Sequence, residues 1–503
     1  MGYIVLFSVL CLLGWIMHSR LFHTLKDILG PFWASVSRFW LGYQVSTGKA
    51  EHTQWRLHER HGPLVRIAPD EVSVADPSSL RVIYGIKGGF TKIRGSLSDT
   101  DFYAPWSPRI TPNGDNFSQQ DEGKHAARRK LVNSVYSMSS VLESEQYIDA
   151  CTDVLMGKMA EFSKTGQAID LAEWIQWYTF NVIGELFFGQ QFGFMRDEHD
   201  FGNYILSLDT LMPSITVMCV LPAFLRALQP LLGLPFPSFC SAVKRFDDIR
   251  HAGKLWVTHR MQQMARQEVD RSDILDKLFQ VRQTRDGFDT PDIQTESFVA
   301  ILAGIDTTAI AIRAILYYLT RTQLSYGKLI AEIDEADRDG RLSRPHVQYS
   351  EAIKLPYLVA CCREGMRLHP SVGLCMPRYV PAGGRIIAGH FIPAGTKVGI
   401  SPPVFHCNKD VFGPDAAEYN PERWLRDPKA AAEMDRHMLH FGAGTRTCIG
   451  KNISLAEIHK MIPQLLREYR LDLADPRKPW DTHNFWFNKQ TGIRVYVTAR
   501  QPS

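Results

Sequence analysis

Apolar residues recur at helical spacing in two long stretches of the chain. The first runs from about Phe298 to Leu319 after the helix-start signal Pro291-Asp292, and it predicts a helix over 292–321 that is about 45 Å long. The second follows Cys448 at three- and four-residue steps and predicts a helix that starts close to this cysteine. Short apolar runs between turn residues predict strands at 64–67, 71–74, 385–387, 397–400 and 493–497. The body is therefore expected to be mainly α-helical with a minor β component.

The N-terminal residues are almost continuously apolar. Between Tyr3 and Met17 only Ser8 and Gly14 interrupt the run, and Arg20 follows it. This pattern predicts a single-pass transmembrane anchor over residues 1–20, with the body held in the cytosol by the basic residues after it. A cleaved signal peptide is the alternative. No Lys or Arg precedes the run and no small-x-small site follows it, which argues against cleavage.

Residues 21–60 carry apolar side chains at three- and four-residue steps, interrupted at Gly30-Pro31. We expect an interfacial or linker segment here, and the alternative is that its aromatic residues pack on the body. A single folded domain is expected at 61–503.

Composition excludes several classes of protein. With 503 residues, 45% of them hydrophobic, the chain can bury a large core. The formal net charge is only +4, so no nucleic-acid partner is expected. The nine cysteines show no repeated spacing, which argues against a disulfide framework or a zinc site.

One cysteine lies in an unusual setting. Residues 441–450 read FGAGTRTCIG. An isolated cysteine is usually a small buried hydrophobic residue, but here Gly444 and Gly450 allow close backbone approach to a flat macrocycle and direct N–H groups at the sulfur of Cys448. Arg446 is suited to a carboxylate such as a haem propionate, and the helix after the loop favours a thiolate. The segment therefore predicts a thiolate ligand for haem iron, which favours O–O bond cleavage.

Three motifs together resemble the cytochrome P-450 superfamily. They are F-x-x-G-x-R-x-C-x-G at 441–450, E-x-x-R at 364–367 and the segment Pro421-Glu422-Arg423-Trp424, and the resemblance covers nearly the whole chain. It implies a triangular helical body with a long central helix over haem b, small β-sheets and a catalytic domain at 61–503. It also implies that Glu364, Arg367 and Arg423 form a buried structural network. A solvated ion pair is the alternative for any isolated E-x-x-R.

The resemblance assigns catalytic roles to Asp306 and Thr307 in the segment 303–308. Thr307 is expected to hydrogen-bond dioxygen and a water, and Asp306 to relay protons from solvent. Gly304 and a bond from Thr307 to its own backbone are expected to open the helix locally and admit O2. The alternative is a satisfied hydroxyl beside a surface charge.

Further residues match the family's haem contacts. His125, where many relatives carry Trp, and Arg129 and Arg378 are expected to bind propionates, together with Arg446. A solvated basic face is the alternative for the segment around His125. The haem-binding loop itself contributes Phe441, Gly444, Arg446 and Gly450.

The segments that match substrate-facing regions of the family are apolar and aromatic. The candidates are Phe102, Tyr103, Trp106, Ile301, Ile305, Val372, Leu374 and Trp486. Each taken alone is an ordinary core residue, and together they indicate a medium-sized hydrophobic substrate. Residues 61–72 are similar to fungal microsomal members of secondary metabolism, including pisatin demethylase-like enzymes, which implies a terpenoid, alkaloid or polyketide and a hydroxylation, demethylation or ring-forming oxidation.

No G-x-G-x-x-G nucleotide-binding segment occurs after a predicted strand, so electrons must come from a separate protein. The resemblance implies the diflavin NADPH-cytochrome P-450 reductase of the endoplasmic reticulum membrane, with cytochrome b5 as a second candidate partner. Docking is expected near Lys124, Arg128, Lys130, Lys451 and Lys460. Two other classes are open: a haem-thiolate isomerase or dehydratase that acts on peroxides, which has no need of an Asp306-Thr307 relay, and a non-catalytic haem sensor.

Overall fold

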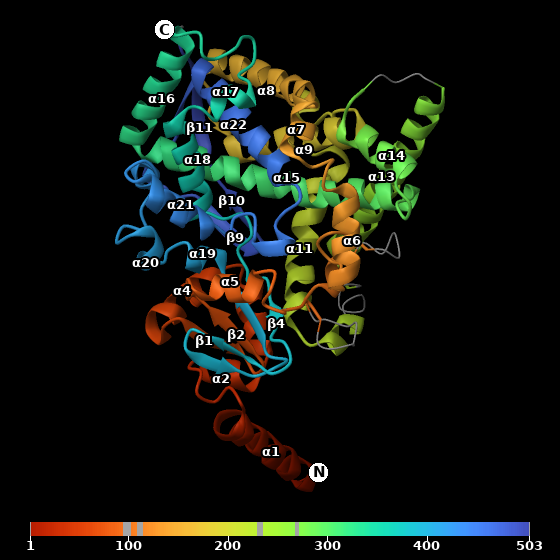
Figure 1. Ribbon diagram of the computed structural model, residues 1–503, viewed down its shortest axis with the longest axis vertical. Coiled ribbons are helices and arrows are strands. Elements are labelled where there is room, and N and C mark those ends of the chain that lie inside the picture. Colours follow the sequence, from red (N-terminus) through yellow and green to blue (C-terminus); the bar gives the residue numbers. More distant parts are fainter. Residues whose placement is uncertain (1, 94–101, 108–113, 229–234, 267–270, 502–503) are drawn as a thin grey trace.

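The computed structural model describes residues 2–93, 102–107, 114–228, 235–266 and 271–501, and Figure 1 shows their arrangement. Helix α1 (Gly2–Met17) projects away from the rest of the molecule, whereas the short π-helix η1 (His18–Phe22) contacts the body through Ser19, which binds Ser35 and Arg66. The stretch Tyr3–Phe22 is long and apolar enough to cross a membrane, and only 6% of its most apolar window is buried. It is therefore suited to anchor the protein in a membrane.

Helices form most of the body, and α15 (Thr290–Arg321) crosses it (Figure 1). Asp289 and Asp292 form a capping box and Pro291 occupies the first turn, so α15 begins at the expected start signal. Its apolar residues are mostly buried, because α9 (Leu171–Phe188), α18 (Pro356–Leu368) and α22 (Lys451–Glu468) pack around it. The predicted helices over 292–321 and after Cys448 are both confirmed.

The remaining helices surround this centre. Those before α15 are α2 (Phe32–Val36), α3 (Phe39–Ser46), α4 (Ala50–His61), α5 (Ser79–Tyr84), η2 (Ala104–Trp106), α6 (Glu122–Val132), α7 (Met138–Leu142), α8 (Glu145–Thr165), α10 (Phe194–Asp197), η3 (Phe201–Asn203), α11 (Tyr204–Val220), η4 (Ala223–Leu228), α13 (Pro237–Ala265) and α14 (Ile274–Thr284). Those after it are α16 (Gln323–Arg338), α17 (Tyr349–Ala352), α19 (Pro402–Phe405), α20 (Lys409–Phe412), η5 (Pro421–Trp424), α21 (Pro428–Arg436) and η6 (Gly444–Arg446).

Within the residues that the structure describes, the strands form four small sheets. One sheet has the order β1-β2-β7-β4 and contains β1 (Leu64–Ala68), β2 (Glu71–Val74), β7 (Lys397–Ile400) and β4 (Arg378–Tyr379). Strands β1 and β2 are antiparallel, whereas β2 and β7 are parallel. The other three sheets are β3-β11-β8 (Ile169–Asp170, Arg494–Ala499, Tyr469–Leu473), β9-β10 (Asp481–Phe485, Phe487–Thr491) and β5-β6 (Arg385–Ile387, His390–Ile392).

All five predicted strands are present, as β1, β2, β5, β7 and β11. The strands that the pattern did not predict are only two to five residues long, and β9 and β10 are largely polar. The sequences of β9 and β10 do not alternate between apolar and polar residues, and these two strands are held in place by their pairing with each other. The mainly helical fold with a minor β component is confirmed.

Residues 21–60 pack partly on the body. Leu25, Leu41 and Val45 are buried in the two apolar clusters around the β1-β2-β7-β4 sheet, whereas Phe22 and Trp33 are exposed. Some apolar residues of this segment pack on the body and others are accessible. Neither the interfacial segment nor packing on the body therefore describes all of these residues.

Candidate active site

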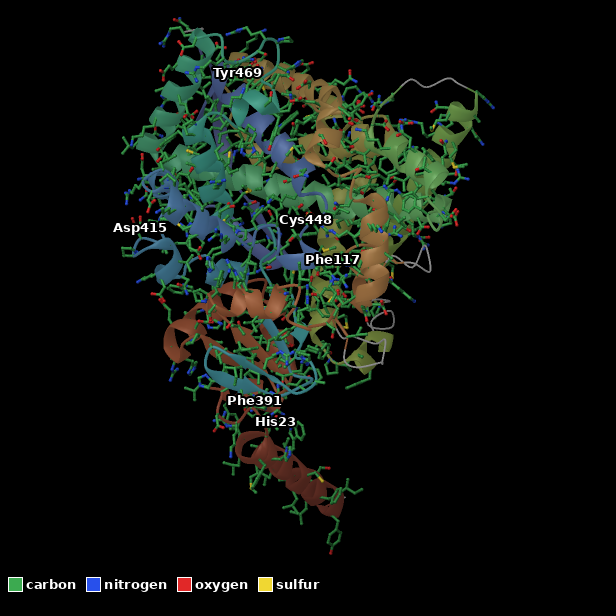
Figure 2. All side chains as sticks on the ribbon, in the orientation of Figure 1. His23, Phe117, Phe391, Asp415, Cys448 and Tyr469 are labelled. Atoms are coloured by element: carbon green, nitrogen blue, oxygen red, sulfur yellow. The ribbon has the colours of Figure 1, made fainter. Side chains whose placement is uncertain are left out.

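The loop that carries Cys448 is closed by its own backbone. The Cys448 N–H donates to the Phe441 carbonyl at 2.8 Å, and Gly442 and Gly444 adopt positive φ angles of 71° and 68°. The thiol then lies just before α22, where the backbone N–H groups of Gly450 and Lys451 point at the sulfur. Figure 2 shows Cys448 near the middle of the helical body in this view. The expected position of the sulfur at a helix N-terminus is confirmed.

The surrounding protein keeps water away from the Cys448 thiol and so raises its pKa. Part of the side chain is nevertheless accessible. The two backbone N–H groups and the charges of Arg129 and Lys451 oppose this rise but do not cancel it. The helix N-terminus alone is thus too weak to favour the thiolate here. Coordination to a metal ion deprotonates a thiol outright, so iron would supply the remaining stabilisation.

Gly444 is required for a reason that the sequence did not show. Its φ lies in the left-handed region, and a Cβ at this position would come within 1.8 Å of the backbone oxygen of Tyr84 at the end of α5. A side chain here would therefore push the cysteine loop off α5.

The E-x-x-R motif forms a buried network, as expected. Arg367 donates to both carboxylate oxygens of Glu364 at 2.9 and 2.8 Å, and Arg423 donates to Glu364 at 2.9 Å. Glu364 and Arg367 are fully buried. Trp424 also donates to Glu364, and Arg367 binds the carbonyls of His406 and Ala416. Arg423 reaches outward to Asp415, which is labelled in Figure 2. The solvated ion pair is thereby excluded.

Basic side chains from four segments gather around His125 on α6. Burial, followed by the nearby cations, lowers the pKa of His125 to about 3, so this imidazole is neutral. The cations are Arg446, Lys92, Arg129 and Arg378. The structure thus brings together all four of the residues expected to bind propionates. The solvated-face alternative is wrong for His125, because its side chain is buried.

Lys92 was not predicted. Its ammonium is buried and donates to the Phe117 carbonyl, and it lies 4.1 Å from the ring centre of Tyr103. Burial lowers the pKa of Lys92 well below its ordinary value. A single lysine between Thr91 and Ile93 carries no motif or periodicity, so only the tertiary structure identifies it.

This set of residues fits haem b. Cys448 offers one sulfur ligand, and the buried Nε2 of His125 has no hydrogen-bond partner within the described part of the chain. The guanidinium groups of Arg446, Arg129 and Arg378 lie around this imidazole. Such cations form strong charge-assisted hydrogen bonds with carboxylates, so they would suit the two propionates.

Thr307 and Asp306 are neighbours on α15 but have different hydrogen-bond partners. The Thr307 hydroxyl donates to the Ala303 carbonyl at 2.6 Å, which is the expected bond to its own backbone. Asp306 is buried, and Gln176 on α9 donates to it at 2.5 Å. The surface-charge alternative for Asp306 is therefore wrong.

The expected local opening near Gly304 does not interrupt the helix. Helix α15 continues as an α-helix from Thr290 to Arg321 without a break. Gly304 instead permits close packing, because a Cβ there would lie 2.6 Å from the Cδ1 of Ile183 on α9.

The substrate-facing candidates fall into two groups. Six of them form one apolar cluster with Phe117, namely Phe102, Tyr103, Trp106, Val372, Leu374 and Trp486. The rings of Phe102, Trp106 and Phe117 lie 5.2 to 5.6 Å from that of Trp486. Tyr103 has a polar task as well, since its hydroxyl accepts from Arg378. Ile301 and Ile305 are fully buried in the large helical core around α15.

The residues expected to dock the redox partner fall into a buried group and an exposed group. Arg128 is buried and pairs with Asp292 and Glu296 at 2.8 Å, and Lys460 is buried and pairs with Glu145 at 2.6 Å. These two cannot meet a partner protein, so that part of the prediction is wrong. Lys124, Lys130 and Lys451 are exposed. Lys124 and Lys130 lie on α6, which contacts the cysteine loop because Arg129 donates to the Thr447 carbonyl at 2.7 Å. Lys451 begins α22 directly after the loop.

Comparison with known proteins agrees with this site. The family model Cytochrome P450 matches residues 31–495. The chain is 41% identical over 498 residues to "Cytochrome P450 monooxygenase gsfF" of Penicillium aethiopicum, covering 97% of this chain and 96% of that protein. It is 39% identical over 374 residues to "Cytochrome P450 monooxygenase ACRTS1" of Alternaria alternata, covering 74% and 99%. It is 32% identical over 494 residues to "Pisatin demethylase" of Fusarium vanettenii, covering 94% and 89%.

Monooxygenases of this kind use O2, a redox partner and a small-molecule substrate. The matched span includes the cysteine loop, the buried E-x-x-R network and the cations around His125. The chain therefore belongs to the Cytochrome P450 family, and the protein is a monooxygenase whose cofactor contains haem iron.

Proposed function

We propose that the enzyme inserts one oxygen atom of O2 into a medium-sized hydrophobic metabolite of fungal secondary metabolism, a terpenoid, alkaloid or polyketide, by hydroxylation, demethylation or a related oxidation. The observation that carries this proposal is the set of similar fungal monooxygenases, one of which is named for the demethylation of pisatin. The apolar cluster around Trp486 supports a substrate of this kind, since it joins aromatic rings from the segments 102–106 and 486–487 and from Phe117. The relatives named as monooxygenases favour this activity over a peroxide isomerase, a dehydratase or a haem sensor.

In this proposal each group of site residues has its own role. Cys448 ligates the iron, while His125, Arg129, Arg378 and Arg446 hold the propionates, and Phe441, Gly444 and Gly450 shape the loop. The haem supplies O2 binding and O–O bond cleavage. Asp306 and Thr307 supply protons, and Glu364, Arg367 and Arg423 hold the loop from behind. The substrate lies against Phe102, Tyr103, Trp106, Ile301, Ile305, Val372, Leu374 and Trp486.

Electrons come from NADPH through the diflavin reductase, with cytochrome b5 as an additional donor. The Tyr3–Phe22 helix anchors the enzyme in the endoplasmic reticulum membrane, with the catalytic domain at 61–503 in the cytosol and residues 21–60 at the interface.

The experiment that tests the substrate class starts from deletion of the gene. The hydrophobic metabolite that accumulates is purified and added to the full-length enzyme with NADPH and the reductase in phospholipid vesicles under ¹⁸O₂. One labelled oxygen atom should appear in the product, or in the formaldehyde that a demethylation releases. Product without label, or product formed without NADPH, would contradict the proposal and favour a peroxide rearrangement.

Thr307→Ala is expected to keep the haem and to divert electrons from product to hydrogen peroxide, with roughly a tenfold rise in peroxide per NADPH. The reason is that the variant lacks the hydroxyl that passes protons onward, and a positioned proton donor contributes about 10²–10⁴-fold. Peroxide and NADPH are measured together. The matched control is Thr308→Ala, because Thr308 is the buried neighbour on the same helix. Unchanged coupling in Thr307→Ala would exclude Thr307 from proton delivery.

Charge reversal of Lys124, Lys130 and Lys451 to Glu is expected to raise the KM for the reductase about tenfold at low salt and much less at high salt. Exposed charges act over a screening length of about 8–10 Å at physiological ionic strength, so salt should remove most of the difference. Arg477→Glu is the control, because Arg477 is equally exposed but lies on the turn after β8. An unchanged KM in the triple variant would place docking elsewhere.

A further inference from the structure

Asp306 belongs to a polar group that also includes Lys489 on β10 and Asp209 on α11. Gln176 donates to its Oδ1, and the ammonium of Lys489 on β10 lies 3.8 Å from the same oxygen. Lys489 is itself nearly buried, with 9% of its side chain exposed. Helix α15 packs against β10, so the contact is part of the body's interior.

Lys489 has a second and closer partner. It binds both carboxylate oxygens of Asp209 on α11, at 2.6 and 2.7 Å. The Asp209 side chain is 38% exposed, whereas that of Asp306 is 4% exposed. Lys489 therefore connects a carboxylate in contact with solvent to one that is sealed inside the protein.

The charges around Asp306 act in opposite directions. Burial raises the pKa of Asp306, and Lys489 is the largest influence that lowers it, while Asp209 raises it. Arg313 on α15 and His483 on β9 also lower it. Arg313 donates through Nη2 to the Ala172 carbonyl and to Gln176, while its Nε and Nη1 have no hydrogen-bond partner among the described residues. Lys489 differs from Arg313 because it also binds a carboxylate that is in contact with solvent.

We propose that Lys489 is a positioning residue for proton delivery, and that it sets the charge state of Asp306 by dividing its ammonium between Asp306 and Asp209. This inference rests on the proposed role of Asp306 in supplying protons. When Asp306 releases the proton from its carboxyl oxygen toward Thr307, the carboxylate that remains is stabilised by Lys489. Asp306 then takes up one proton that solvent supplies on the Asp209 side, while Lys489 keeps its ammonium charge. One proton enters and one leaves, so all three groups return to their starting states.

Two substitutions should move the titration of Asp306 in opposite directions. Lys489→Met removes a positive charge, so the pKa of Asp306 should rise. Asp209→Asn removes a negative charge and leaves Lys489 to Asp306 alone, so the pKa should fall. An opposite charge within about 4–6 Å shifts the pKa of a carboxyl by about 1–3, so the rise in Lys489→Met should be within that range. Loss of packing would not produce shifts of opposite sign.

The measurement is a pH titration of the infrared carboxylic-acid band of Asp306 in the full-length haem enzyme, with the band assigned by its loss in Asp306→Asn. Lys489→Arg keeps the charge and should restore the wild-type titration. Arg500→Met is the matched control, because it breaks a partly buried ion pair with Asp334 elsewhere in the molecule. A band whose titration is the same in wild type, Lys489→Met and Asp209→Asn would overturn the inference.

A second readout separates this inference from the proposed function. With NADPH and reductase but no added substrate, Lys489→Met should release severalfold more hydrogen peroxide per NADPH, and Lys489→Arg should not. If Asp306→Asn leaves the peroxide yield unchanged, the proton-supply role of Asp306 fails, whatever the titration shows. If Asp306→Asn raises the yield but Lys489→Met does not, the role of Lys489 alone fails.

Discussion

Replacing Cys448 with serine is expected to abolish the strongly red-shifted Soret band of the ferrous CO complex and to lower turnover by at least about 1,000-fold, or about 4 kcal/mol of activation free energy. The hydroxyl of serine is too weak an acid to form a comparable anion, so the electron donation that favours O–O cleavage is lost. The surrounding N–H groups of Gly450 and Lys451 do not compensate, because even the native thiol has a raised pKa before iron binds.

The CO-difference spectrum and the haem content are measured on the same preparation, so loss of haem and loss of the thiolate are distinguished. Cys240→Ser is the control, since Cys240 is exposed on α13, and it should keep the native spectrum. A thiolate-type CO spectrum in Cys448→Ser would show that another residue ligates the iron.

Glu364→Ala is expected to prevent accumulation of the folded haem enzyme. The substitution leaves Arg367 and Arg423 buried without their shared carboxylate, and the N–H groups of Trp424 and Asn420 also lose their acceptor. Breaking a buried ion pair in this way costs about 3–5 kcal/mol, which is a large share of the roughly 5–15 kcal/mol that stabilises a folded protein. The yield of haem-bound protein and its thermal unfolding midpoint measure the effect.

Glu433→Ala is the control for this prediction. Glu433 forms an i,i+3 ion pair with Arg436 at 2.7 Å, but both side chains are exposed, so its removal should leave the yield and the midpoint unchanged. A Glu364→Ala enzyme with native yield and midpoint would mean that the buried network does not hold the fold.

Local signals were sufficient for much of the fold. The helices over 290–321 and after Gly450 follow from apolar periodicity together with capping residues, which act within a few positions of one another. Five strands were found because their apolar runs end at turn residues, whereas β9 and β10 were not, because their sequences DTHNF and FNKQT are largely polar. Pairing between them holds these strands, and pairing leaves little trace in a single segment.

The errors at the site have one common origin. Arg128 and Lys460 look like solvated cations in the sequence, yet acids from α15 and α8 bury and neutralise them. Gly304 looks like a weak point of its helix, yet it serves as a contact for Ile183. In each case the deciding neighbour lies more than a hundred residues away in the chain.

The sequence by itself identified the family, and it singled out Cys448 because the proposed ligation of iron depends on a short loop whose residues are contiguous. It also determined the partners within the E-x-x-R motif, which are one helical turn apart. Only the tertiary structure decided which cations gather around His125, that Lys92 is among them, and that Asp306 turns toward Gln176 and Lys489. Burial and charge depend on distances between segments that are remote in the chain, and those distances exist only after the chain has folded.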